Sequence, residues 1–331
     1  MVRYIMRRLM MLPFLLLLFS VLIFIIIQAP PGDFLSSYIA QLAATGSSVS
    51  TQQAEALRAQ YGLDRSVVEQ YFLWLGNVLQ GNLGVSMEYR QPVADLILAR
   101  LGPTVILALF ALVFTWALAL PLGIIGAVKQ HTVIDYVFTV FSYIGVATPN
   151  FLIALVFMWW AFSAFGVNLS GLNSQEFQDA PWDLARILDF LNHLWIPMII
   201  LGLDGTARLA RIMRANLLDE LNKPYVEAAR TRGLSEYQVI LKYPVRMALS
   251  PLVSTIGWYL PQLFSGSLIL ATVMNLPNIG PLLLRALTNQ DMFLAGSILL
   301  VYSLLTIIGT LISDILLAWL DPRIQLDRAA A

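Results

Sequence analysis

Residues 103–128 read PTVILALFALVFTWALALPLGIIGAV, a stretch without a charged side chain. A helix needs about 20 predominantly apolar residues to cross the hydrocarbon core of a bilayer, and this stretch is long enough to do so. Further apolar runs lie on either side of it, at 9–28, 136–165, 194–212, 249–273 and 293–320. The pattern predicts an all-α integral membrane protein with about six transmembrane helices.

The composition supports this prediction and excludes several classes of function. Hydrophobic residues make up 58% of the 331-residue chain and charged residues 12%, whereas soluble domains carry about 25% charged residues. The formal net charge is zero, so no basic excess indicates a nucleic acid partner. The chain has no cysteine, and its two histidines, His131 and His193, lie far apart. We therefore expect neither disulfides nor a metal site.

The N-terminal run could be mistaken for a cleaved signal peptide, because Arg3, Arg7 and Arg8 precede it. Its apolar part is longer than the usual stretch of about 7 to 15 residues, and the following sequence, IQAPP, lacks a small-x-small cleavage site. We therefore expect a retained first helix. Lys and Arg are concentrated in the segments that this topology places inside, so both termini are predicted to be cytoplasmic.

Three regions follow from this topology. Residues 1–28 form the N-terminal tail and first transmembrane helix, 29–102 an extracytoplasmic helical cap, and 103–331 a five-helix core. Within the cap, apolar spacing predicts helices at 51–60 and 67–79. Two roles remain open for the cap: a structural plug without solute contact, or a docking surface for an external partner.

The segment 215–246, between the fourth and fifth predicted spans, is expected to form two short cytoplasmic helices. Pro224 suits the first position of a helix, and Gly233 suits the left-handed backbone that ends one. Ser235 followed by Gln238 indicates a capping box at the start of the second helix. The residues alone leave two interpretations open: amphipathic helices that lie on anionic lipid, or a lever that contacts a partner protein.

The order Glu227-Ala228-Ala229, three intervening residues and Gly233 resembles the EAA loop of the permease subunits of bacterial ABC importers. The surrounding sequence 223–236, KPYVEAARTRGLSE, is similar to the dipeptide/oligopeptide/nickel branch of that family. The resemblance extends over almost the whole chain. Further matching positions are Pro31-Gly32-Asp33, Gly62-Leu63-Asp64, Gln70-Tyr71, Trp74-Leu75, Leu83-Gly84, Ser86, Pro92-Val93, Pro149, Phe151, Arg208 to Arg214 and Asp321-Pro322-Arg323.

This resemblance implies a type I ABC importer (MetI-like) fold, in which the EAA helix docks on a cytoplasmic ATPase and transmits its closure to the membrane helices. The coupling positions that it implies here are Glu227, Ala228, Ala229, Gly233, Ser235 and Ile240. The implied partners are a second homologous permease subunit, two ABC ATPase subunits and an extracytoplasmic solute-binding protein. The implied location is the bacterial cytoplasmic (inner) membrane, in contact with its lipid.

ATP hydrolysis is not expected in this chain itself. A Walker A loop requires Gly-x-x-x-x-Gly-Lys-Ser/Thr, because glycine amides cradle the phosphates while lysine neutralises them. The three lysines precede Gln130, Pro224 and Tyr243 instead. We therefore expect no cofactor in this chain, and ATP and Mg²⁺ to be bound by the partner ATPases.

Ionisable residues at membrane depth are candidates for function. Asp204 lies about ten residues into the fourth apolar run, 194–212, and Arg208 follows one helical turn later on the same face. Two interpretations remain: a polar site on the translocation path, where Asp204 contacts a solute amine, or a salt bridge that hides both charges. Trp258 and Gln262 in the fifth run are further candidates for the path.

The identity of the solute stays open. The chain departs from the usual pattern of the branch at Asn82, Gly102 and Tyr243-Pro244, and 272–278 lacks an acidic residue and a Pro-Gly pair. Oligopeptides are therefore weighed against oligosaccharides, on which tryptophan rings can stack. An ATP-independent channel or secondary transporter would leave the EAA loop unexplained, and an intramembrane enzyme would need a paired nucleophile and base.

Overall fold

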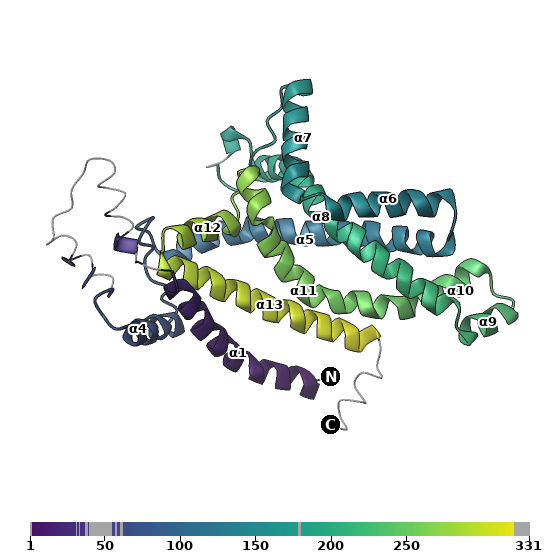
Figure 1. Ribbon diagram of the computed structural model, residues 1–331, viewed down its shortest axis with the longest axis horizontal. Coiled ribbons are helices and arrows are strands. Elements are labelled where there is room, and N and C mark those ends of the chain that lie inside the picture. The colour runs from purple at the N-terminus through teal and green to yellow at the C-terminus, as the bar shows by residue number, and fades with distance from the viewer. Residues whose placement is uncertain are drawn as a thin grey trace. The chain divides into compact units, whose positions relative to one another are not determined.

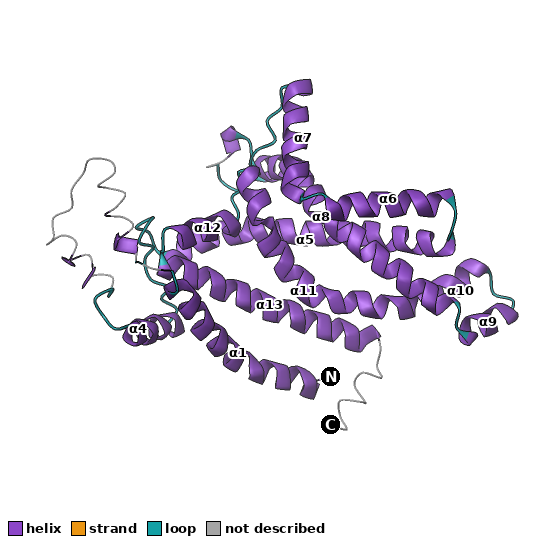
Figure 2. Cartoon of the chain, in the orientation of Figure 1, coloured by secondary structure: helices purple, strands orange, loops and turns teal. Residues whose placement is uncertain are grey.

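The computed structural model describes residues 2–30, 32, 34–36, 39, 55–56, 58–59, 62–177 and 180–320. Within these ranges the secondary structure is helical apart from one antiparallel bridge, between Val85 and Pro92 (Figure 2). This confirms the all-α prediction. The helices labelled in Figure 1 are α1 (Val2–Gln28), α4 (Val67–Leu79), α5 (Val93–Val128), α6 (Val133–Ala147), α7 (Asn150–Phe165), α8 (Leu184–Leu221), α9 (Pro224–Thr231), α10 (Glu236–Lys242), α11 (Pro244–Val273), α12 (Ile279–Thr288) and α13 (Met292–Leu320).

Large apolar side chains cover the outside of the long helices. Val113, Phe141 and Trp159 are each about two thirds exposed, a pattern that soluble monomers avoid. Among the described residues, α1, α5, α8 and α13 are long and apolar enough to cross a membrane, and α6 with α7 supplies a fifth crossing if the pair counts as one. The remaining predicted run lies within α11, where several side chains are outside the described set, so the total of six stays a prediction.

The third predicted run, 136–165, forms two helices rather than one. α6 and α7 meet at 98°. Thr148, between them, has an extended backbone with φ −97° and ψ 120°, and Pro149 precedes the first residue of α7. Proline lacks an N–H and disfavours helical geometry at the residue before it, so α6 ends at this position.

Helix α8 extends beyond the predicted run 194–212 at both ends. It begins after Asp183, whose carboxylate accepts a hydrogen bond from the backbone N–H of Arg186 at 2.8 Å. Its 38 residues correspond to about 57 Å at 1.5 Å per residue, whereas the hydrocarbon core is only about 30 Å thick. α8 is therefore long enough to connect the membrane region directly to the loop that follows it.

The described chain divides into two compact units. The larger comprises Met1–Ile5, Thr104–Pro277 and Thr306–Ala331, and the smaller Met6–Pro103 and Asn278–Leu305. In the larger unit α8 is central, since it packs against α6 and α11 and shares apolar clusters with α5. The domain boundaries expected from the sequence stay a prediction.

In the smaller unit, α4 has the predicted bounds. It starts with a capping box in which Ser66 Oγ accepts from the Glu69 N–H at 3.3 Å and Glu69 Oε2 accepts from the Ser66 N–H at 3.0 Å. Its buried residues are Gln70 and Trp74, and Trp74, 2% exposed, packs in a cluster that also holds Phe24. The helix predicted at 51–60 lies largely outside the described residues.

Candidate functional site: the coupling loop and the polar face of α8

Two short helices, α9 and α10, follow the end of α8 and lead into α11 (Figure 1). Pro224 is the first residue of α9, as predicted. Gly233 has φ +76°, in the left-handed region, and its N–H donates to the Arg230 carbonyl at 3.0 Å. The capping box of Ser235 and Gln238 starts α10. All three local predictions for this loop, hereafter the coupling loop (215–246), are confirmed.

The coupling loop has a small apolar core of its own. Val226 and Ala229 on α9 pack against Val239 on α10, and all three are buried. Glu227 and Ala228, by contrast, are exposed. The three EAA residues therefore separate: the glutamate and the first alanine face outward, while Ala229 allows α9 and α10 to approach each other.

Ile240 faces the membrane helices rather than the outside. Its side chain is 8% exposed and belongs to a cluster with Met213 and Leu217 of α8 and Leu252 of α11. An apolar contact of this kind fixes α10 to the two helices that flank the loop. Of the six predicted coupling positions, Glu227, Ala228, Gly233 and Ser235 are exposed and Ala229 and Ile240 are internal.

An ion pair bridges the turn at Gly233. Arg230 donates to both carboxylate oxygens of Glu236, with Nη2–Oε1 at 2.7 Å and Nε–Oε2 at 3.1 Å. This bidentate pairing holds the pKa of the Glu236 carboxyl below its usual value, so the pair is present at neutral pH and is lost as the pH falls through that lowered pKa. Both side chains are about half exposed, which limits the contribution to stability.

The predicted pairing of Asp204 with Arg208 is present on α8. Arg208 Nη2 lies 3.0 Å from Asp204 Oδ2. The Arg208 side chain stays 35% exposed and that of Asp204 21%, so the salt bridge alone does not hide the two charges. Arg211 lies close to the same face and places its guanidinium 5.4 Å from the centre of the Tyr143 ring on α6. These residues form a polar face in the middle of α8.

The other predicted path residues are less closely placed. Gln262 on α11 is half-buried, and the side chain of Trp258 lies outside the described set. The neighbouring Tyr259, not selected from the sequence as a path residue, reaches both α5 and α8. Its hydroxyl lies 3.2 Å from Thr115 Oγ1, and a Cβ on Gly205 would overlap it. Gly205, next to Asp204, was the feature of the sequence that could have indicated a close contact at this point of α8.

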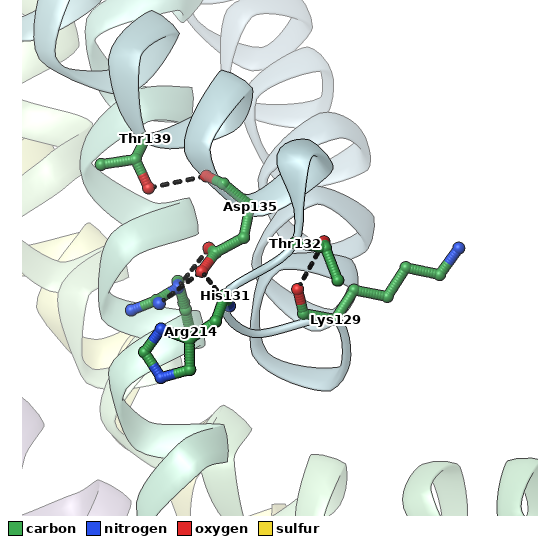
Figure 3. Close-up of polar contacts among 6 residues, drawn as sticks. All are labelled: Lys129, His131, Thr132, Asp135, Thr139 and Arg214. Carbon is green, nitrogen blue, oxygen red and sulfur yellow. Dashed lines mark hydrogen bonds and ion pairs between the residues drawn. The ribbon is translucent and has the colours of Figure 1, made fainter.

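A third ion pair, between Asp135 and Arg214, joins the start of α6 to α8 (Figure 3). Arg214 donates from Nε to Oδ1 and from Nη2 to Oδ2, each at 2.8 Å, and the His131 N–H donates to Oδ2 at 3.1 Å. The Asp135 side chain is only 5% exposed. Sequence analysis missed this pair because no local pattern links residues so far apart.

The described residues offer no group of three or more His, Asp or Glu side chains that could hold a metal ion.

Two family models together match most of the chain. Residues 119–326 match the model described as binding-protein-dependent transport system inner membrane component, and residues 1–108 match the N-terminal model of the same kind of transport protein. The first match includes the whole coupling loop, all three ion pairs and the polar face of α8. The chain belongs to this family.

Whole-length relatives agree with the assignment of this permease. A Brucella suis biovar 1 (strain 1330) protein named as a peptide permease is 35% identical, over 98% of this chain and 99% of that protein. The oligopeptide transport system permease protein AppB of Bacillus subtilis (strain 168) is 32% identical over 98% and 100% of the two chains. The glutathione transport system permease protein GsiC of Escherichia coli (strain K12) is 31% identical over 98% and 99%.

The family confirms the expected class of function. The chain is a membrane permease subunit of an ABC importer, with a multi-pass location in the inner membrane, and it works with an ATPase and a solute-binding protein. The names of these relatives do not favour the oligosaccharide alternative.

Proposed function

We propose that this permease forms half of the translocation pathway of an importer for short peptides, and that its coupling loop receives the movement of a separate ATPase. The observation that carries the proposal is the two-sided structure of the loop. Glu227 and Ala228 are exposed for contact with a partner, whereas Ile240 is packed against α8 and α11. A push on the exposed side is thereby transmitted to membrane helices.

The proposed assembly contains a second, homologous permease subunit, two ATPase subunits and an external solute-binding protein. ATP and Mg²⁺ are bound by the ATPases, and this chain supplies no cofactor site. Both termini face the cytoplasm, on the same side as the coupling loop. In support of this orientation, the loop carries Arg230, Arg232 and Lys242, and basic residues are enriched in cytoplasmic segments.

The polar face of α8 is the proposed wall of the path. A charged side chain at the centre of a bilayer costs about 2.5–3.5 kcal/mol on insertion scales, so such residues face protein or water rather than lipid. Asp204 and Arg208 are both partly exposed in this subunit. We place them, with Gln262 and Trp258 of α11 as further candidates, beside the solute. Tyr259 then holds α11 against α8 next to the path.

Short peptides are the proposed solute because the names of three relatives share that chemistry: peptide, oligopeptide and glutathione. Co-expression with the neighbouring transport genes, purification and reconstitution in proteoliposomes test this assignment. We expect ATP-dependent uptake of a labelled tripeptide that unlabelled peptides inhibit and a malto-oligosaccharide does not. Inhibition by the sugar alone would overturn the peptide assignment, and uptake without ATP would overturn the importer.

The path assignment predicts an effect of charge at Asp204. Asp204→Asn removes the carboxylate that would accept a hydrogen bond from a solute ammonium group. Since charge-assisted hydrogen bonds contribute about 1.5–3 kcal/mol, uptake of a free tripeptide should fall about tenfold or more. Uptake of its N-acetylated form should change little. Glu176→Gln, at an exposed acid before α8 and outside the coupling loop, is the matched control and should leave both rates unchanged. Equal losses for both peptides would contradict a path role.

A further inference from the structure

The Asp135 carboxylate is held more completely than a simple surface salt bridge. Its two oxygens accept two hydrogen bonds from one guanidinium and a third from the backbone of His131, which has φ +63° in the turn before α6. Figure 3 shows the carboxylate and the guanidinium facing each other across α6 and α8. A planar bidentate pair fixes direction as well as distance, so α6 cannot slide along α8 without breaking it.

Helix α5 provides the space that the pair occupies. A Cβ on Gly126 would lie 3.3 Å from Arg214 Cδ and 3.5 Å from Asp135 Oδ1. One turn earlier, a Cβ on Gly123 would lie only 2.6 Å from Met213 Cβ. The glycines therefore let α5 lie directly against α8 at the residues around Arg214. The ion pair sits at a junction of three helices.

The same part of α8 also contacts the coupling loop. Met213, next to Arg214, belongs to the same apolar cluster as Ile240 of α10. α8 then continues only as far as Leu221 before α9 begins. A displacement of α10 thus reaches the turn of α8 that carries Arg214. From there the bidentate pair is the polar connection to α6, which leads to the bend before α7.

We infer that Asp135 and Arg214 are positioning residues that pass movement of the coupling loop from α8 to α6 and the bent helix pair. Neither residue contacts nucleotide or solute. The inference rests on the proposed coupling role of the loop. It adds that the movement of the loop is delivered to α6 and α7 in the membrane region.

The test measures the amount of solute taken up per ATP hydrolysed by the whole complex in proteoliposomes. We expect Asp135→Asn to keep ATP hydrolysis within about twofold of wild type and to lower uptake per ATP about tenfold, within the range found for residues that carry coupling. Arg214→Lys keeps the charge but loses the bidentate geometry, and should show a smaller loss of about threefold.

A double variant distinguishes a role in coupling from a role in stability alone. Asp135→Leu with Arg214→Met replaces the pair by apolar side chains of similar volume, a change that often preserves stability. We expect it to assemble as wild type does and still to show low uptake per ATP. If the Asp135→Asn variant fails to assemble, the double variant still tests the coupling role of the pair. Wild-type uptake per ATP in the double variant would overturn the inference.

A distance measurement provides a second readout. Because the chain has no cysteine, spin labels can be placed on it at Tyr237→Cys of α10 and Val140→Cys of α6, both at exposed positions. With Asp135 present, the distance between the labels should stay narrowly distributed when ATP is added. In the Asp135→Asn variant, the distribution of distances should broaden. An unchanged distribution in the variant would contradict the inference. Absence of ATP-driven uptake in the wild-type complex would instead refute the proposed function.

Discussion

Replacing Gly233 with proline is expected to abolish ATP-driven uptake while leaving the permease inserted in the membrane. Gly233 has φ +76°, whereas proline fixes φ near about −65°. Proline also removes the N–H that donates to the Arg230 carbonyl at 3.0 Å. The turn between α9 and α10 cannot form, so the exposed EAA residues lose their fixed orientation. Uptake and solute-stimulated ATP hydrolysis by the purified complex measure the effect.

A graded series at the same position provides the control. Gly233→Asn should transport nearly as well as wild type, because asparagine tolerates the left-handed region. Gly233→Ala keeps the N–H but places a Cβ in that region at a cost of about 1–2 kcal/mol, and should be intermediate. No heavy atom lies within 4 Å of the added Cβ, so backbone conformation alone sets the order. Equal transport by the proline and asparagine variants would refute this account of the turn.

The largest loss of stability is expected for Gly123→Ala in α5. The new Cβ would lie 2.6 Å from Met213 Cβ and 2.7 Å from the carbonyl oxygen of Ala210. Because one of these neighbours is backbone, α5 and α8 must separate, and overpacking of this kind costs about 1–3 kcal/mol or more. The melting temperature of the detergent-purified complex should fall, and the contact between the helices near Arg214 should loosen.

Gly102→Ala on the same helix is the matched control. No heavy atom lies within 4 Å of its added Cβ, and alanine is favoured over glycine in a helix by about 0.8–1.0 kcal/mol. Its melting temperature should be unchanged or slightly raised. A similar decrease for both variants would show that glycine is needed in α5 for reasons other than close packing against α8.

Local sequence signals predicted the coupling loop and α4 well. Pro224, Gly233 and the Ser235–Gln238 pair each set the backbone of their own turn, and the structure has each of them as expected. The bounds of α4 followed from its apolar spacing and the glycines after it. In these segments the residues that determine the structure are neighbours in the chain, so the sequence alone contains the relevant interactions.

The direction of side chains was harder to predict. Ala228 and Ala229 are identical in chemistry, yet one is exposed and the other packs against α10. Ile240 was expected among the coupling positions, and its place in a cluster with α8 and α11 gives it an internal role. A helix of seven or eight residues can present several faces to its neighbours, and only tertiary packing selects one.

Long-range contacts and helix lengths depended on the fold itself. Asp135 and Arg214 are 79 residues apart, and neither has a local pattern that identifies the other. Hydropathy marked only the middle of α8, since the helix continues through residues too polar for lipid. The third run was predicted as a single span. Its bend of 98° lies beside Pro149, and α7 packs against α8 and α11 beyond it.

The most direct test of the central claim is a cross-link from the exposed side of α9 to the partner ATPase. The absence of native cysteines allows Ala228→Cys, which is exposed, to be compared with Ala229→Cys, which occupies a buried position. In the intact transporting complex, a short thiol cross-linker should join Ala228→Cys to the ATPase subunit and leave Ala229→Cys unmodified. Failure of Ala228→Cys to cross-link in a complex that still transports, or equal cross-linking from both positions, would contradict the account.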